Sequence, residues 1–232
     1  MGVIWNGIVE AMRLLVRGDV EVLRIAALTL RVSGTATLFA VAVGVPLGTA
    51  LGLVSFRGRR AVVSVVNLGM GLPPVVVGLW VSIFLWRYGP FGFLHLLYTP
   101  AAMIVAQATL ALPIVTALTM AAVQQLDPRL RLQVLALGAS RPQFLWCLWR
   151  EARFSLMAAV MAGFGGAVSE VGASMMVGGN MLGRTRVLTT ATVMEVARGN
   201  YALAIALSII LLVIAYLVVL ALTLAQQRRR PA

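Results

Sequence analysis

Residues 199–227 read GNYALAIALSIILLVIAYLVVLALTLAQQ, a run of 29 residues without a charge between Arg198 and Arg228. A helix needs about 20 consecutive apolar residues to cross the hydrocarbon core of a bilayer. Four comparable stretches precede this run, separated by arginines and other polar residues. The pattern therefore predicts an all-α membrane protein with five transmembrane helices, at residues 32–54, 62–86, 100–123, 154–177 and 202–225.

The composition agrees with a lipid environment. Of the 232 residues, 61% are hydrophobic and only 11% are charged, whereas about a quarter of a soluble domain is charged. The formal net charge of +12 comes entirely from 19 arginines, since the chain has no lysine. These arginines lie in clusters between apolar runs, which is typical of loops that orient a membrane protein and argues against nucleic-acid binding.

Several kinds of site are excluded by residue counts. Cys147 and His95 are each the single residue of their type, so an intrachain disulfide and a metal site built from His and Cys are ruled out. We predict no catalytic residue, because no histidine pair or serine with an evident base is present. A P-loop requires lysine, so ATP chemistry must belong to another chain.

The arginine distribution predicts an orientation. Eleven arginines fall in the first loop, the third loop and the tail, and seven fall on the other side, where acids dilute them. The side richer in arginine faces the cytoplasm. The N-terminus is therefore expected outside and the C-terminus inside.

The chain divides into three parts by this reasoning. Residues 1–24 have apolar residues at helical spacing but charges that rule out a secretory signal, so we expect an amphipathic helix in the membrane interface. Residues 25–227 form the transmembrane domain, with a cytoplasmic loop at 124–153. Residues 228–232 form a cytoplasmic tail.

Small residues and prolines mark the spans. Gly44, Gly48 and Gly52 share one face of the first helix, and Ala159, Gly163 and Ala167 repeat the pattern in the fourth, which predicts close helix packing. Pro73 and Pro74 interrupt the second span and Pro113 the third. The prolines fit either a simple kink or a broken helix beside a water-filled cavity, and the sequence leaves both open.

The loop at 124–153 is expected to be helix, glycine turn, helix. Asp127 can cap the first helix before Pro128, and Gly138 can end it in a left-handed conformation. Ser140 and Gln143 have the spacing of a capping box for the second helix. That helix is apolar and aromatic, which suits either a partner's groove or the bilayer surface.

The loop centre resembles a known motif. Residues 137–140, LGAS, look like the glycine-centred core of the loop in permease subunits of ATP-binding-cassette (ABC) importers. Gly138 and Leu148 match that pattern. Residues 132–134 (LQV) and 150–151 (RE) depart from its Glu-Ala-Ala and Leu-Pro.

A closer resemblance covers nearly the whole chain. The stretch 163–180, GFGGAVSEVGASMMVGGN, and the following 184–190, RTRVLTT, look like permeases of the tungstate and molybdate importer group, the tungstate type above all. Residues 14–15 (LL), 18–19 (GD), 71–79 (GLPPVVVGL), 89–92 (GPFG) and 150–154 (REARF) match the same group.

This resemblance implies a type I ABC importer permease in the cytoplasmic (inner) membrane. It implies a homodimer, an extracytoplasmic solute-binding protein, and two cytoplasmic ABC ATPases that hold ATP and Mg²⁺, with no cofactor bound by this chain. The expected ATPase-coupling residues are Gly138, Ala139, Ser140, Arg141, Phe144 and Leu148.

Glu170 is the one charge inside the fourth predicted span. It would either line a pathway or act as an anchor, paired with Arg184 or Arg186 or placed at a helix terminus. A carboxylate repels a dianion, so hydrogen-bond donors are better contacts for an oxyanion. The full candidate pathway set is Ser169, Glu170, Gly165, Ser174, Asn180, Pro73 and Pro74. An alternative function is an ion-coupled secondary transporter in which Glu170 carries protons.

The orientation can be tested by cysteine labelling in a background without Cys147. We expect a membrane-impermeant maleimide to label a cysteine near Gly92 in intact cells, and one near Gly58 only after permeabilisation, because the loop at Gly58 is rich in arginine. Labelling near Gly58 but not near Gly92 in intact cells would reverse the orientation.

Overall fold

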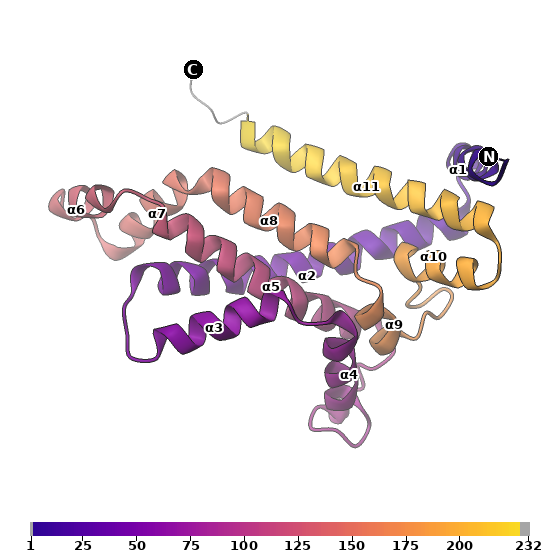
Figure 1. The fold of residues 1–232 in the computed structure, drawn as a ribbon, viewed down its shortest axis with the longest axis horizontal. Coiled ribbons are helices and arrows are strands. Elements are labelled where there is room, and N and C mark those ends of the chain that lie inside the picture. Colours follow the sequence, from indigo (N-terminus) through magenta and orange to yellow (C-terminus); the bar gives the residue numbers. More distant parts are fainter. Residues whose placement is uncertain (1, 228–232) are drawn as a thin grey trace.

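The computed structural model describes residues 2–227 and is helical, with no strand in that range (Figure 1). Three helices are long and apolar enough to cross a membrane alone: α2 (Val20–Leu53), α5 (Pro100–Gln124) and α11 (Tyr201–Gln227). Two bent pairs provide two more candidate spans, α3 (Arg59–Met70) with α4 (Pro74–Leu85) and α8 (Arg153–Val168) with α9 (Gly172–Gly178). The all-α membrane class is confirmed. The shorter elements are α1 (Gly2–Arg17), η1 (Gly92–Leu94), α6 (Pro128–Ala136), α7 (Arg141–Glu151) and α10 (Leu188–Ala197).

Helix α2 begins twelve residues before the first predicted span. Its N-terminus is set by Asp19, whose carboxylate accepts hydrogen bonds from the backbone N–H groups of Glu21 and Val22. The 34 residues of α2 extend about 51 Å at 1.5 Å per residue, well beyond a hydrocarbon core of about 30 Å. The segment 1–24 therefore contains a helix end at Arg17 and the start of α2.

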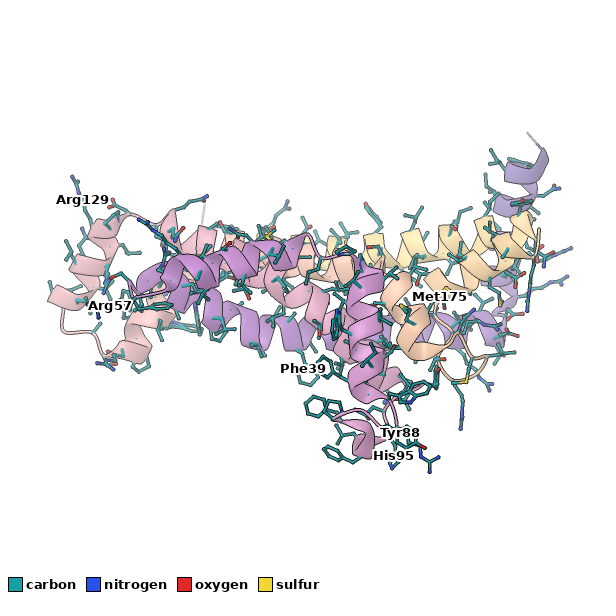
Figure 2. The ribbon with its side chains drawn as sticks, turned by 60° about the horizontal axis from the view of Figure 1, so that its bottom comes forward. Phe39, Arg57, Tyr88, His95, Arg129 and Met175 are labelled. Carbon is teal, nitrogen blue, oxygen red and sulfur yellow. The ribbon has the colours of Figure 1, made fainter. Side chains whose placement is uncertain are left out.

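The second and fourth predicted spans are not continuous helices. The chain bends by 104° between α3 and α4, and by 57° between α8 and α9. The first break is where Pro73 and Pro74 lack backbone donors and Pro73 is extended. It is far sharper than a kink. As a result α4 stands out sideways from the long helices, with Tyr88 and His95 at its tip (Figures 1 and 2).

The centre of the bundle is the contact of α2 with α5. A Cβ atom added to Gly48 would lie 2.4 Å from the backbone oxygen of Thr116, and one on Gly44 would lie 3.1 Å from the Thr116 hydroxyl. Helix α8 joins this contact through Gly163, whose added Cβ would lie 2.7 Å from Val115 Cγ2. Both predicted small-residue stripes therefore bring helix backbones close together.

The first and last helices also pack together. A Cβ atom on Gly7 of α1 would lie 2.5 Å from Ile205 Cγ2 of α11, and Ala11 is buried in the same contact region. Several other large apolar side chains of α1 are exposed, among them Trp5 and Met12, whereas Leu14 is half-buried. Placement of α1 in the membrane interface stays a prediction.

One end of the bundle gathers the loops that were predicted to share a side. Arg57 and Arg129 lie at the same end (Figure 2), which is also the end where α11 finishes (Figure 1). The tail, 228–232, is outside the described residues. For labelling near Gly92, Tyr88 is the better position: it is 87% exposed, whereas a Cβ atom on Gly92 would lie 2.3 Å from the Trp86 carbonyl oxygen.

The glycine contact gives a matched pair of stability variants. Gly48→Ala should lower the free energy of unfolding by about 1–3 kcal/mol, because its Cβ must displace the backbone of α5. Gly34→Ala, in the same helix, meets nothing within 4 Å and should be neutral or stabilising by up to about 1 kcal/mol. Equilibrium unfolding in detergent micelles measures both. Equal stability of the two variants would contradict the importance of the α2–α5 approach.

Candidate functional site

The two helix breaks lie against each other. Helices α4 and α9 pack so closely that a Cβ atom on Gly78 would lie 2.7 Å from the Cα atom of Ala173. A Cβ atom on Gly172 would likewise lie 2.7 Å from Val75 Cγ2. The fold thus brings the candidate pathway residues at the start of α4 close to those that precede α9, although they are distant in the sequence.

Glu170 lies in the break between α8 and α9 and is only 7% exposed. Its carboxylate accepts a hydrogen bond from the backbone N–H of Ala173 at 2.8 Å, and its backbone oxygen accepts one from the Thr189 hydroxyl at 3.1 Å. This is the helix-terminus arrangement of an anchor. Arg186, a possible partner from the sequence, forms its ion pair with Glu21 instead.

Three other candidate pathway residues, Ser169, Ser174 and Asn180, have different surroundings. The Ser169 hydroxyl is exposed and donates to the Gly165 carbonyl oxygen at 2.8 Å. Ser174 is fully buried and accepts a hydrogen bond from Gln107 Nε2 at 3.0 Å, so it joins α9 to α5. Asn180 has a left-handed backbone, with φ of 49°. A transport role for these residues stays a prediction.

The segment from α9 to α10 is irregular but well bonded. The Thr185 hydroxyl donates to the Gly178 carbonyl oxygen at 2.6 Å and accepts from the Met181 N–H at 3.0 Å. The Thr29 hydroxyl of α2 accepts from the Leu188 N–H at 3.0 Å. Helix α10 itself was not expected as a separate element, because its threonine-rich start carries no strong capping signal.

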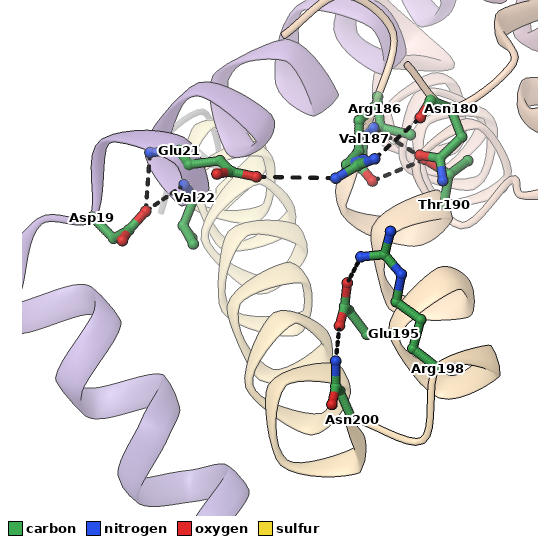
Figure 3. Close-up of polar contacts among 10 residues, drawn as sticks. All are labelled: Asp19, Glu21, Val22, Asn180, Arg186, Val187, Thr190, Glu195, Arg198 and Asn200. Atoms are coloured by element: carbon green, nitrogen blue, oxygen red, sulfur yellow. Dashed lines mark hydrogen bonds and ion pairs between the residues drawn. The ribbon is translucent and has the colours of Figure 1, made fainter. Parts of the chain in front are cut away.

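The turn after α10 is held by a carboxylate whose two oxygens each accept a hydrogen bond (Figure 3). Glu195 is buried and accepts from Arg198 Nη1 at 3.0 Å and from Asn200 Nδ2 at 2.8 Å. An ion pair hydrogen-bonded on both oxygens satisfies the buried charge. This fixes the angle at which the chain leaves α10 and enters α11.

The predicted helix–glycine–helix loop is present as α6 and α7. Asp127 caps α6 by accepting from the Arg129 N–H at 2.8 Å, and Gly138 is left-handed, with φ of 76°. Gln143 accepts hydrogen bonds from the backbone N–H of Ser140 at 2.8 Å and from its hydroxyl at 3.0 Å. These contacts explain why a glycine separates two short, independently capped helices.

One face of the loop is anchored and another is exposed. Leu148 is only 4% exposed, and Trp149 Nε1 donates to the Thr49 hydroxyl of α2 at 3.0 Å. Phe144 and Ala139 are half-buried, whereas Gly138, Ser140 and Arg141 are exposed. The sequence placed the exposed Trp146 on the aromatic second helix, but sequence reasoning missed the Trp149–Thr49 link and three exposed leucines of the loop, Leu132, Leu135 and Leu137.

Residues 44–231 match a family model described as the binding-protein-dependent transport system inner membrane component. A tungstate uptake system permease of Peptoclostridium acidaminophilum is 43% identical over 93% of this chain and 95% of its own. A probable anion ABC transporter permease of Haloferax volcanii is 42% identical over 81% of this chain and 83% of its own. A tungstate uptake permease of Campylobacter jejuni is 34% identical over 92% of this chain and 89% of its own.

Solved structures share the fold at low sequence identity. The inward-facing methionine ABC transporter MetNI aligns with a TM-score of 0.67 at 22% identity, covering 94% of each chain. An amino acid ABC transporter aligns with a TM-score of 0.66 at 17% identity, covering 92% of this chain and 96% of its own. The chain therefore belongs to the family of inner membrane components of binding-protein-dependent transport systems, as a non-enzymatic ABC importer permease whose ATPase is a separate chain.

Proposed function

We propose that this permease moves a tetrahedral oxyanion into the cytoplasm, tungstate in the first place and molybdate as its chemical neighbour. The observation that carries the proposal is the 43% identity, over 93% of the chain, to a tungstate uptake permease. Molybdenum transport permeases are more distant, for example one of Azotobacter vinelandii at 29% identity over 75% of this chain.

The working assembly in this proposal contains two copies of the chain, two ABC ATPases that hold ATP and Mg²⁺, and an extracytoplasmic binding protein. Exposed aromatic and apolar side chains on α4 and its tip support the homodimer, among them Trp80, Phe84 and Phe93. The tip beyond α4, with Tyr88 and His95, projects from the rest of the protomer (Figure 2). A second copy would cover this apolar surface.

Coupling to the ATPases is assigned to the loop formed by α6 and α7. Leu137 and Trp146 are exposed there and suit a hydrophobic groove. The Trp149–Thr49 hydrogen bond joins the same loop to α2. In this assignment the loop end of the bundle is cytoplasmic, the N-terminus is outside and the C-terminus is inside.

The pathway is assigned to the neighbourhood of the α4–α9 contact, where Pro73, Pro74, Gly165 and Ser169 surround the two helix breaks. Broken helices inside a membrane protein occur where the backbone is buried or faces a wet cavity. Proton coupling through Glu170 gains no support, since its carboxylate caps the start of α9.

Substrate choice is tested in vesicles that hold the permease, its ATPase and its binding protein. We expect ATP-dependent accumulation of tungstate or molybdate, measured by mass spectrometry of the metal, and none with a non-hydrolysable ATP analogue. ATP-dependent sulfate uptake without either metal oxyanion would overturn the substrate assignment.

The coupling role predicts a defect in Gly138→Val. Its Cβ meets nothing within 4 Å, so the substitution acts through the left-handed backbone, where a β-branched residue costs about 1–3 kcal/mol. We expect transport and transport-stimulated ATP hydrolysis to fall several-fold in a folded protein. Gly138→Asn is the control, because asparagine tolerates this conformation, and it should retain most activity. A fully active Gly138→Val variant would refute the role of this turn.

A further inference from the structure

A cavity of about 790 Å³ lies between the N-terminal third of α2 and the segment that joins α9 to α10. Four arginines line it, Arg24 and Arg31 from α2 and Arg184 and Arg186 from the connecting segment. The one acidic lining residue is Glu21. Sequence reasoning used Arg31 as a boundary of the first uncharged run, counted the other three as loop charges and weighed Arg184 and Arg186 as partners of Glu170; it did not bring the four together.

The arrangement of the arginines follows from helix geometry. Arg24 and Arg31 are seven residues apart, which is two turns of helix, so both lie on one face of α2. Arg184 and Arg186 belong to the opposite wall, in the segment held by the Thr185 hydrogen bonds. The two walls therefore direct four positive charges at one space.

Glu21 does not balance this charge. Its carboxylate is 4.0 Å from Arg186 Nη1 and its side chain is 58% exposed (Figure 3). A long, solvated ion pair of this kind contributes little. The cavity keeps a net positive charge in the absence of a ligand.

Arg186 is the innermost of the four. Its side chain is 14% exposed, its Nη2 donates to the Asn180 carbonyl oxygen at 3.5 Å, and its Nε is buried without a hydrogen-bond partner among residues 2–227. The amide oxygen of Asn180 is also buried and unpartnered within that range. Because Nε is buried, an anion in the cavity would be held through the terminal nitrogens of this guanidinium, with the charge of the group kept in place by its burial.

The cavity lies outside the apolar part of the bundle. Residues 32–53 of α2 carry no charge and extend about 33 Å, close to the thickness of the hydrocarbon core. Arg31 precedes this stretch directly, beside Pro100, the first residue of α5. The cavity is thus at the boundary of the core, at the end opposite to α6 and α7 (Figure 1).

We propose that this cavity is a binding site for a tetrahedral oxyanion, held by the guanidinium groups of Arg186 and Arg184 with Arg24 and Arg31 across from them. Guanidinium forks match the oxygens of such anions geometrically and stay charged at any physiological pH. The ligand is either the free dianion or the phosphodiester of an anionic lipid headgroup, since both present charged terminal oxygens on a tetrahedral centre. The free-ion case rests on the proposed function, which puts this cavity on the side from which the substrate arrives.

The test measures binding and does not require transport. The purified permease–ATPase complex, without binding protein, is placed in nanodiscs of phosphatidylcholine and titrated with tungstate by calorimetry. We expect binding that weakens at least about tenfold in Arg186→Gln. The double variant Arg24→Gln/Arg31→Gln changes exposed side chains only and should weaken binding similarly without a folding defect. Arg13→Gln, on α1 outside the cavity lining, removes one charge as Arg186→Gln does, and should bind as the wild type does.

A second arm identifies the source of the oxyanion. Nanodiscs that contain phosphatidylglycerol are analysed by native mass spectrometry for lipid retained by the complex. Tungstate binding in phosphatidylcholine supports the free ion. Retention of phosphatidylglycerol that the double variant loses, with no tungstate binding, supports the headgroup.

Two results would overturn the site. The first is that neither ligand binds, or that both bind the double variant as tightly as the wild type. The second is unchanged tungstate binding with weaker association of the binding protein, which would make the arginines a protein-docking surface. Either result can occur while vesicles still accumulate tungstate, so failure of this site is distinguishable from failure of the proposed function.

Discussion

The requirement that every backbone polar group find a partner in the absence of water shapes this molecule. Two helices break within the candidate spans, and each break releases N–H and C=O groups. Side-chain oxygens bond several backbone groups in the second break and in the segment after α9: Glu170 receives the Ala173 N–H, Thr185 bonds Gly178 and Met181, and Thr29 receives the Leu188 N–H. The irregular segment around α9 is tolerated because these bonds hold it.

That segment depends in turn on the packing beneath it. Helices α2, α5 and α8 approach closely through glycine and alanine. From α5, Gln107 donates a hydrogen bond to the Ser174 hydroxyl of α9 and so joins α9 to this packed group of helices. The same α2 carries Thr49 near one end, bonded to Trp149 of α7, and Arg24 near the other. One helix therefore contacts both the loop proposed for coupling and the arginine-lined cavity.

Much of the fold follows from local sequence signals. Uncharged runs placed the helices at 100–123 and 202–225, and the signals at Asp127 and Gly138 placed α6, α7 and the turn between them. The extension of α2 to Val20 was missed, because charges near a helix end were taken to mark the membrane boundary. The 104° break was beyond prediction, since proline spacing alone does not fix an angle. The arginine cavity joins residues more than 150 positions apart, and one sequence carries no signal for such pairing.

The contact between α1 and α11 bears on biosynthesis. The ribosome makes Gly7 well before Ile205, and these two residues pack directly against each other. The small-residue face of α1 therefore stays uncovered until α11 has been synthesised and inserted. A nascent chain stopped before α11 lacks this contact, so α1 gains its packing partner late in synthesis.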